Sequence, residues 1–170
     1  DGEVRPTRGT LALRVLAPGA GDVAPVPTGP ELEAYDRFHL LRCTADEQEL
    51  WSWDGESMAH AALEPGLHIV VNGGLDVDSD PLVPHFAPLL AEVLDADLAA
   101  GHWGGWPALL TGDGLAGDDE RALLVERVIE GHAYGSTSGA LVALAAGGGV
   151  RYDFTATPSD PGSWVSVLSC

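Results

Sequence analysis

Two pairs of β-like segments, each joined by a short turn, constrain the fold of this chain most. The first pair is Arg37 to Cys43 (RFHLLRC) and Glu49 to Asp54 (ELWSWD), on either side of a polar turn. The second pair is Ala140 to Ala146 and Val150 to Thr155, on either side of a run of glycines. Segments this close along the chain pair antiparallel, because a parallel pair needs a crossover of about a dozen residues or more. The sequence therefore predicts antiparallel sheets.

Other periodic segments surround these hairpins. Further strands are expected at Thr10 to Ala17, Leu67 to Val71 and Trp164 to Leu168. A helix is predicted from Leu82 to Asp97, with two prolines that confine it to the second half of that range. A second helix is predicted from Asp118 to Glu130, with an acidic first turn. The order of strands, helices and strands indicates an α+β fold.

Composition excludes several classes of partner. The chain has 170 residues, of which 45% are hydrophobic, so we expect one globular domain over residues 1–170. Its 26 acidic and 8 basic residues give a formal charge of −18, which disfavours nucleic acid and anionic membrane surfaces. No apolar run reaches the roughly 18 residues of a membrane span, so membrane insertion is not expected. Cys43 and Cys170 suit reduced thiols in a cytoplasmic protein.

Metal and nucleotide motifs fail on their context. Gly19 and Gly21 start a dinucleotide-like pattern, but prolines follow where a helix should open. The acidic run from Asp76 to Asp80 lacks the glycine and glutamate of a calcium loop. The six histidines form no zinc motif, so no metal site is predicted, although a single histidine would suffice to bind haem. Gly135 to Gly139 (GSTSG) is interpreted as a polar turn before a strand.

Tryptophans and one asparagine raise two questions about a ligand. Trp51 and Trp53 share a strand face and are expected in the core. Residues 100–117 are predicted to form a flexible loop rich in Trp and Gly, whose large side chains could cover a ligand. Asn72, in VVNGG, either forms a tight hairpin turn or directs its carboxamide into a cleft. We favour the cleft, because the acidic segment after Gly74 has few β-forming residues.

Four segments, in the same order, resemble motifs of the NRDE family (transport and Golgi organization protein 2-like). These segments are Arg8 to Leu16, Tyr35 to Leu41, Leu63 to Leu75 and His132 to Phe154. The resemblance implies an αββα sandwich similar to the N-terminal-nucleophile hydrolases. It also implies links to haem trafficking and to acyl-CoA or lipid handling. The family's opening cysteine segment is absent, and Thr137 stands where the family usually has arginine. We therefore expect the C-terminal two-thirds of a family member or a degenerate relative.

Three hypotheses about function follow. The first is a non-catalytic module that binds a small amphipathic molecule, haem or an acyl-thioester. Its predicted ligand-binding residues are His68, Asn72, Gly73, Tyr134, Thr137 and Ser138. The second is an amide hydrolase whose nucleophile lies on a missing N-terminal segment, with Asn72 stabilising the oxyanion; no catalytic residue is assigned within this chain. The third is a structural fragment without a ligand. A fragment with exposed sheet edges is expected to self-associate.

Overall fold

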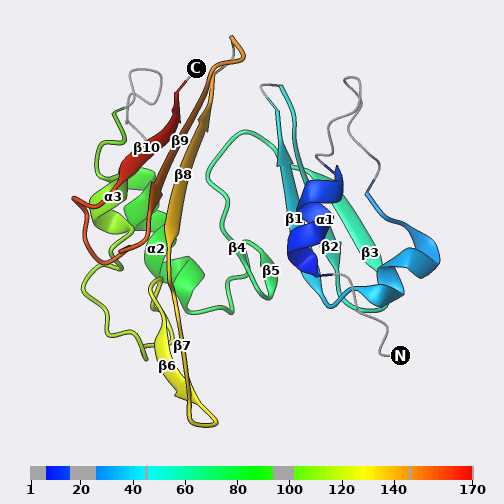
Figure 1. The fold of residues 1–170 in the computed structure, drawn as a ribbon, viewed down its shortest axis with the longest axis horizontal. Coiled ribbons are helices and arrows are strands. Elements are labelled where there is room, and N and C mark those ends of the chain that lie inside the picture. Colours follow the sequence, from blue (N-terminus) through cyan, green and yellow to red (C-terminus); the bar gives the residue numbers. More distant parts are fainter. Residues whose placement is uncertain (1–6, 16–25, 45, 94–101, 146, 170) are drawn as a thin grey trace. The chain divides into compact units, whose positions relative to one another are not determined.

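The computed structural model describes residues 7–15, 26–44, 46–93, 102–145 and 147–169. The chain divides into two compact units, Asp1–Pro65 and Gly66–Cys170, where the sequence led us to expect one domain. Each unit contains antiparallel sheet and short helices (Figure 1), so the α+β class is confirmed. Among the described residues, no helix is long and apolar enough to cross a membrane.

In its described part, the first unit is a three-stranded antiparallel sheet with two short helices. Its elements are α1 (Arg8–Val15), the 3-10 helix η1 (Gly29–Ala34), β1 (Phe38–Cys43), β2 (Gln48–Trp53) and β3 (Met58–Ala62). The strand order is β1-β2-β3, so the first predicted hairpin is confirmed, and β3 adds a strand that was not predicted.

The strand predicted at Thr10 to Ala17 is wrong, because its described part lies in the helix α1. The hydroxyl of Thr7 accepts a hydrogen bond from the Thr10 amide (3.3 Å), as an N-cap residue does. Leu11 and Val15 are one helical turn apart and are both buried. The buried residues therefore follow the helical period, and not the alternation of a strand.

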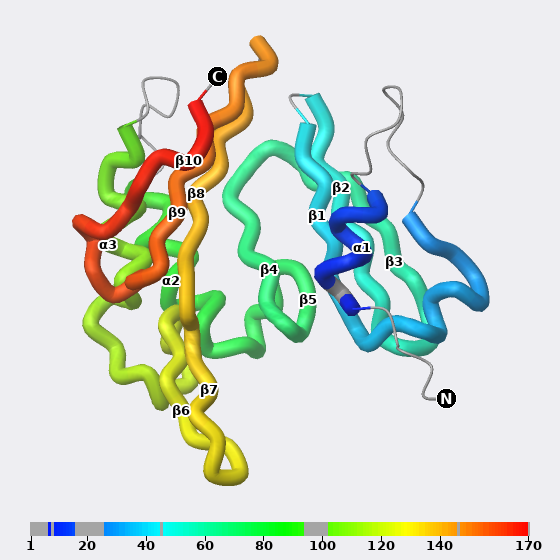
Figure 2. Tube along the Cα trace, in the orientation of Figure 1, coloured from blue at the N-terminus to red at the C-terminus, as the bar shows by residue number. Residues whose placement is uncertain are grey.

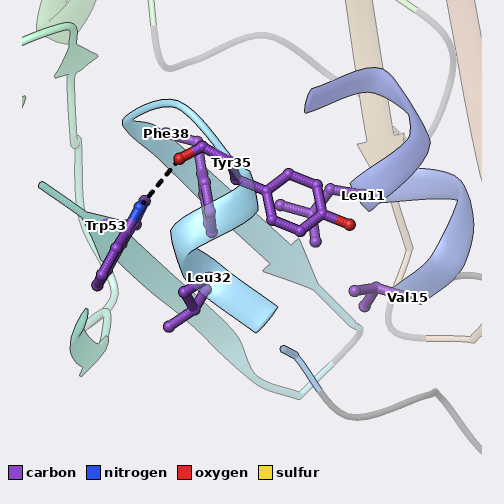
Figure 3. Packing of buried hydrophobic residues seen from close by; sticks show 6 residues of the cluster. All are labelled: Leu11, Val15, Leu32, Tyr35, Phe38 and Trp53. Atoms are coloured by element: carbon purple, nitrogen blue, oxygen red, sulfur yellow. Dashed lines mark hydrogen bonds between the residues drawn. The ribbon is translucent and has the colours of Figure 1, made fainter. Parts of the chain in front are cut away.

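The core of the first unit joins its helices to the sheet. Its buried side chains are Leu11, Val15, Leu32, Tyr35, Phe38 and Trp53 (Figure 3). The rings of Tyr35 and Phe38 meet edge to face, with centroids 6.2 Å apart. The indole N–H of Trp53 donates to the Tyr35 carbonyl (3.3 Å), which satisfies the one polar atom of that side chain. The prediction that Trp53 lies in the core is therefore confirmed.

Trp51 lies on the same sheet face but has polar neighbours. Its ring stacks on His60, with centroids 4.6 Å apart, and the guanidinium of Arg42 lies 5.1 Å from its centroid. The carboxylate of Glu49 bonds both Arg42 and His60. Burial raises the pKa of Glu49, but these two hydrogen bonds outweigh it and hold that pKa below its usual value.

The described residues of the second unit form another three-stranded antiparallel sheet, two helices and two small hairpins (Figures 1 and 2). Its helices are α2 (Leu82–Glu92) and α3 (Trp106–Leu109). The sheet has the order β10-β9-β8. Its strands are β8 (Gly139–Leu144), β9 (Val150–Thr155) and β10 (Val165–Ser169). The second predicted hairpin and the final strand are thus confirmed.

The helix predicted from Asp118 to Glu130 is wrong. The end of that range forms β6 (Glu126–Ile129), which pairs with β7 (His132–Gly135). Glu130 and Gly131 make the two-residue turn between them, with φ of 52° and 83°. Two successive positive φ values characterise the type I′ turn, which glycine favours at its second position. Gly131 therefore turns a hairpin and does not end a helix.

Helix α2 begins at Leu82, so the prediction that the two prolines confine the helix to the second half of its range is wrong. The Asp80 carboxylate accepts a hydrogen bond from the Leu82 amide (3.0 Å) at the helix start. Pro84 lies in the first turn, where a missing N–H costs nothing, and Pro88 is accommodated inside the helix. Residues 94–97 lie outside the described part of the chain.

The segment predicted to be a flexible loop contains a buried tryptophan. Within its described part, residues 102–117, Trp103 is buried and α3 follows it. The indole N–H of Trp103 donates to Oδ2 of Asp153 on β9 at 2.6 Å. Trp103 is therefore a packing residue of the second unit and not part of an open lid.

Candidate functional site

Asn72 and Gly73 form the two-residue turn of the smallest hairpin. That hairpin joins β4 (Val70–Val71) to β5 (Gly74–Leu75), and Asn72 is exposed at its tip. The expectation that no partner strand follows Asn72 is wrong, because two residues suffice to close this turn. The Asn72 carboxamide thus lies on a surface bend, which removes the argument for directing it into a cleft.

His68 belongs to the base of the same hairpin. Its Nδ1 lies 2.7 Å from Oδ2 of Asp76, and Oδ1 of Asp76 accepts from the Ile69 amide at 2.7 Å. Burial raises the pKa of Asp76, but the hydrogen bonds from His68 and Ile69 outweigh it and lower that pKa. The His68 side chain therefore has a structural partner in Asp76.

An open hollow of about 1450 Å³ lies beside the β6–β7 hairpin. Its other walls come from the segment before β6 and from the segment after β9. We call it the β6–β7 hollow. Its lining residues are Thr111, Leu115, Gly117, Asp118, residues 124–129, residues 133–137 and residues 156–159.

Close backbone contacts build the wall around β6. The Glu126 amide donates to the Gly117 carbonyl (2.8 Å), and the Ser136 amide donates to the Val125 carbonyl (2.9 Å). A Cβ at Gly117 would lie 2.6 Å from Glu126 Cβ, and one at Gly135 would lie 2.7 Å from the Val125 carbonyl oxygen. Both positions therefore require glycine, because any side chain would push the wall apart.

The walls of the hollow combine apolar and hydroxyl groups. Tyr134 is 59% exposed and Val128 is 75% exposed, so large apolar surface faces solvent here. Hydroxyl groups come from three segments: they are Thr111, Ser136, Thr137, Thr157 and Ser159. The Ser136 hydroxyl accepts from the Val125 amide (3.0 Å) and is therefore already engaged. Such a wall suits a molecule with an apolar body and a few polar groups.

The charged residues in and beside the hollow differ in their hydrogen-bond partners. Asp118 and Glu126 are its acidic residues, and Arg127 is the only cation among the described lining residues. Nη2 of Arg127 donates to the backbone carbonyl of Asp119 (3.2 Å). The Asp119 carboxylate is held by Arg121 instead, whose side-chain and amide hydrogen bonds keep the pKa of Asp119 well below its usual range. Arg127 thus keeps its charge available.

The structure separates the residues that the sequence proposed for ligand binding. Tyr134 and Thr137 line the β6–β7 hollow, and Ser138 follows them before β8 without being among its described lining residues. His68, Asn72 and Gly73 lie in the β4–β5 hairpin and are also not among them.

Sequence reasoning missed Arg127 because it was assigned to a helix. The alternation of RVIEGHAY around a Glu-Gly pair is the hairpin signal that would have placed it opposite Tyr134. In the described part of the chain, no group of three or more His, Cys, Asp or Glu side chains could hold a metal ion.

No protein-family model, curated protein or solved structure matches this chain. The resemblance to the NRDE family therefore stays a prediction, as does the αββα sandwich that it implies. In the second unit, the residues whose chemistry bears on function are those that line the β6–β7 hollow.

Proposed function

We propose that this chain is an NRDE-type binding module whose β6–β7 hollow holds a small amphipathic molecule. The observation that carries the proposal is the wall itself, where Tyr134 and Thr137 lie among exposed apolar side chains and hydroxyl groups. Exposed apolar surface in a concave region is costly in water unless a ligand or partner covers it.

The volume of the hollow supports a ligand as large as haem or an acyl-thioester. Pockets for drug-sized molecules have volumes of about 300–1,000 Å³, and the β6–β7 hollow has about 1450 Å³. An acyl chain would lie along Leu115, Leu124 and Ile129, where each buried methylene contributes about 0.8 kcal/mol. The hydroxyl groups would bind the polar end of the same molecule.

Haem and an acyl-thioester make different demands on this wall. Haem iron is ligated in proteins by His, Cys, Met or Tyr. Among the described lining residues, Tyr134 is the one side chain of that set. An acyl-thioester needs no such ligand, and relies on the apolar track alone. Replacing Tyr134 by Phe therefore separates the two, because the phenol oxygen matters for haem and not for an acyl chain.

Direct titration tests the proposal. The chain is titrated with palmitoyl-CoA by calorimetry and with haem by its Soret absorbance. Saturable binding of either is expected, and Ile129→Asp should weaken it at least about tenfold by placing a charge in the apolar track. Val167→Asp is the matched control, because Val167 is also exposed (58%) and is not among the lining residues. Equal loss in both variants, or no saturable binding, would refute the proposal.

A further inference from the structure

Arg127 stands out in a chain with a large excess of acid. The chain has 26 acidic residues against 8 basic ones, and all of the basic residues are arginine. Four arginines form ion pairs with carboxylates among the described residues: Arg14, Arg42, Arg121 and Arg151. Within that part of the chain Arg127 makes no ion pair, and the one hydrogen bond of its guanidinium goes to a backbone carbonyl. A guanidinium left without a carboxylate in such a protein is suited to an external anion.

The position of Arg127 places that charge beside a second donor. Arg127 pairs with Tyr134 across the β6–β7 hairpin, so the two side chains leave the same face of the ribbon. Both line the β6–β7 hollow. The guanidinium and the phenol O–H are hydrogen-bond donors, and a carboxylate accepts from both kinds of group. The hairpin thus presents two neighbouring donors at one point on a largely apolar wall.

We infer that Arg127, with Tyr134, selects amphipathic molecules that carry an acidic head group over neutral molecules with the same tail. This inference rests on the proposed function, because it names the ligand class for the same hollow. The apolar tail lies along the wall, and the acidic head group pairs with the Arg127 guanidinium.

Two molecules with the same tail test the inference: dodecanoate and dodecan-1-ol. Binding is measured by displacement of the neutral fluorescent probe N-phenyl-1-naphthylamine. In the unmodified chain, dodecanoate should bind about tenfold or more tightly than dodecan-1-ol, as one charge-assisted hydrogen bond provides. In Arg127→Gln that preference should disappear, while binding of dodecan-1-ol stays unchanged. Arg14→Gln removes the same charge from the first unit and should alter neither.

The outcomes distinguish this inference from the proposed function. If both molecules bind but Arg127→Gln leaves the preference intact, the inference is wrong and the proposed function stands. If neither binds the unmodified chain, the proposed function fails and the inference with it.

Discussion

The buried carboxylate of Asp153 ties the segment before α3 to the sheet of the second unit. Asp153 is 4% exposed, and its Oδ2 accepts from the Trp103 indole (2.6 Å) and from Arg151 (2.8 and 3.1 Å). The Arg151 guanidinium also lies 5.9 Å from the centroid of the Trp103 ring. Because these three side chains contact one another, the cost of removing one depends on the other two.

Trp103→Phe removes the indole donor and keeps an aromatic ring in the site. A hydrogen bond to a charged group contributes about 1.5–3 kcal/mol, and no discount for solvent applies because Asp153 is almost fully buried. The smaller ring adds a packing cost on the order of 1 kcal/mol. We therefore expect the free energy of unfolding of the second unit to fall by about 2.5–4 kcal/mol.

A double-mutant cycle separates the hydrogen bond from the packing. Urea unfolding is followed by circular dichroism for Trp103→Phe, Asp153→Asn and the double variant. Packing of the smaller ring contributes equally on both sides of the cycle, so the coupling energy reports the indole–carboxylate contact. We expect a coupling of about 1–3 kcal/mol. A coupling below about 0.5 kcal/mol would refute the claim that this contact anchors the segment.

The same carboxylate predicts a dependence on pH. Burial raises the pKa of Asp153, but the hydrogen bonds from Arg151 and Trp103 outweigh it and lower that pKa. A pKa lower in the folded state than its unfolded value of about 3.9 stabilises the fold above that value. This stabilisation is lost as the pH falls through the folded pKa. Between about pH 5 and pH 2, the unmodified chain should therefore lose more stability than Asp153→Asn.

Three further changes test the local structure. Thr7→Ala removes the N-cap of α1 and should cost about 1 kcal/mol in urea unfolding, whereas no loss would show that the cap is idle. Gly131→Val places a β-branched residue at φ of 83° and should therefore lower the melting temperature. The control is Gly147→Val, which should change the melting temperature less. A Cβ at Gly147 meets nothing within 4 Å. Glu49→Gln should weaken the first unit at pH 7 and reduce its sensitivity to acid below about pH 4. The reason is that the lowered pKa of Glu49 stabilises the folded state only above that pH. An unchanged acid transition would contradict this.

Turn chemistry made the main hairpins predictable from the sequence. The polar turn after Cys43 and the glycines after β8 separate segments rich in β-forming residues, and both hairpins are present. The same chemistry was under-used elsewhere. Asn72-Gly73 and Glu130-Gly131 are two-residue turns, yet the first was assigned to a cleft and the second to the end of a helix. The partner strand of the first turn has two residues, so its composition gave little β signal.

The wrong predictions about helices come from local sequence patterns that are compatible with two structures. The acidic residues at 118–120 suit a helix N-terminus, but Asp119 instead closes a turn by accepting from the Arg121 amide (2.9 Å). The apolar residues of α1 satisfy both a strand and a helix over so short a range, and the Thr7 cap decides between them.

The candidate site was predictable only in part. The GSTSG region pointed to Tyr134 and Thr137, which line the β6–β7 hollow, while Asn72 and His68 lie in another hairpin. Arg127 could not be chosen while it was assigned to a helix, since its place beside Tyr134 depends on the strand register. The wall from residues 156–159 comes after β9 and carries no motif in the sequence.

Mapping where an amphipathic molecule binds tests the central claim most directly. Backbone amide shifts are recorded while the isotope-labelled chain is titrated with dodecanoate. We predict saturable shifts at residues 124–129 and 133–137, with smaller ones at 111–118 and 156–159, which together line the hollow. Shifts confined to the exposed valines of β8 and β10 (Val142, Val165 and Val167), or no saturable shifts at all, would contradict the account.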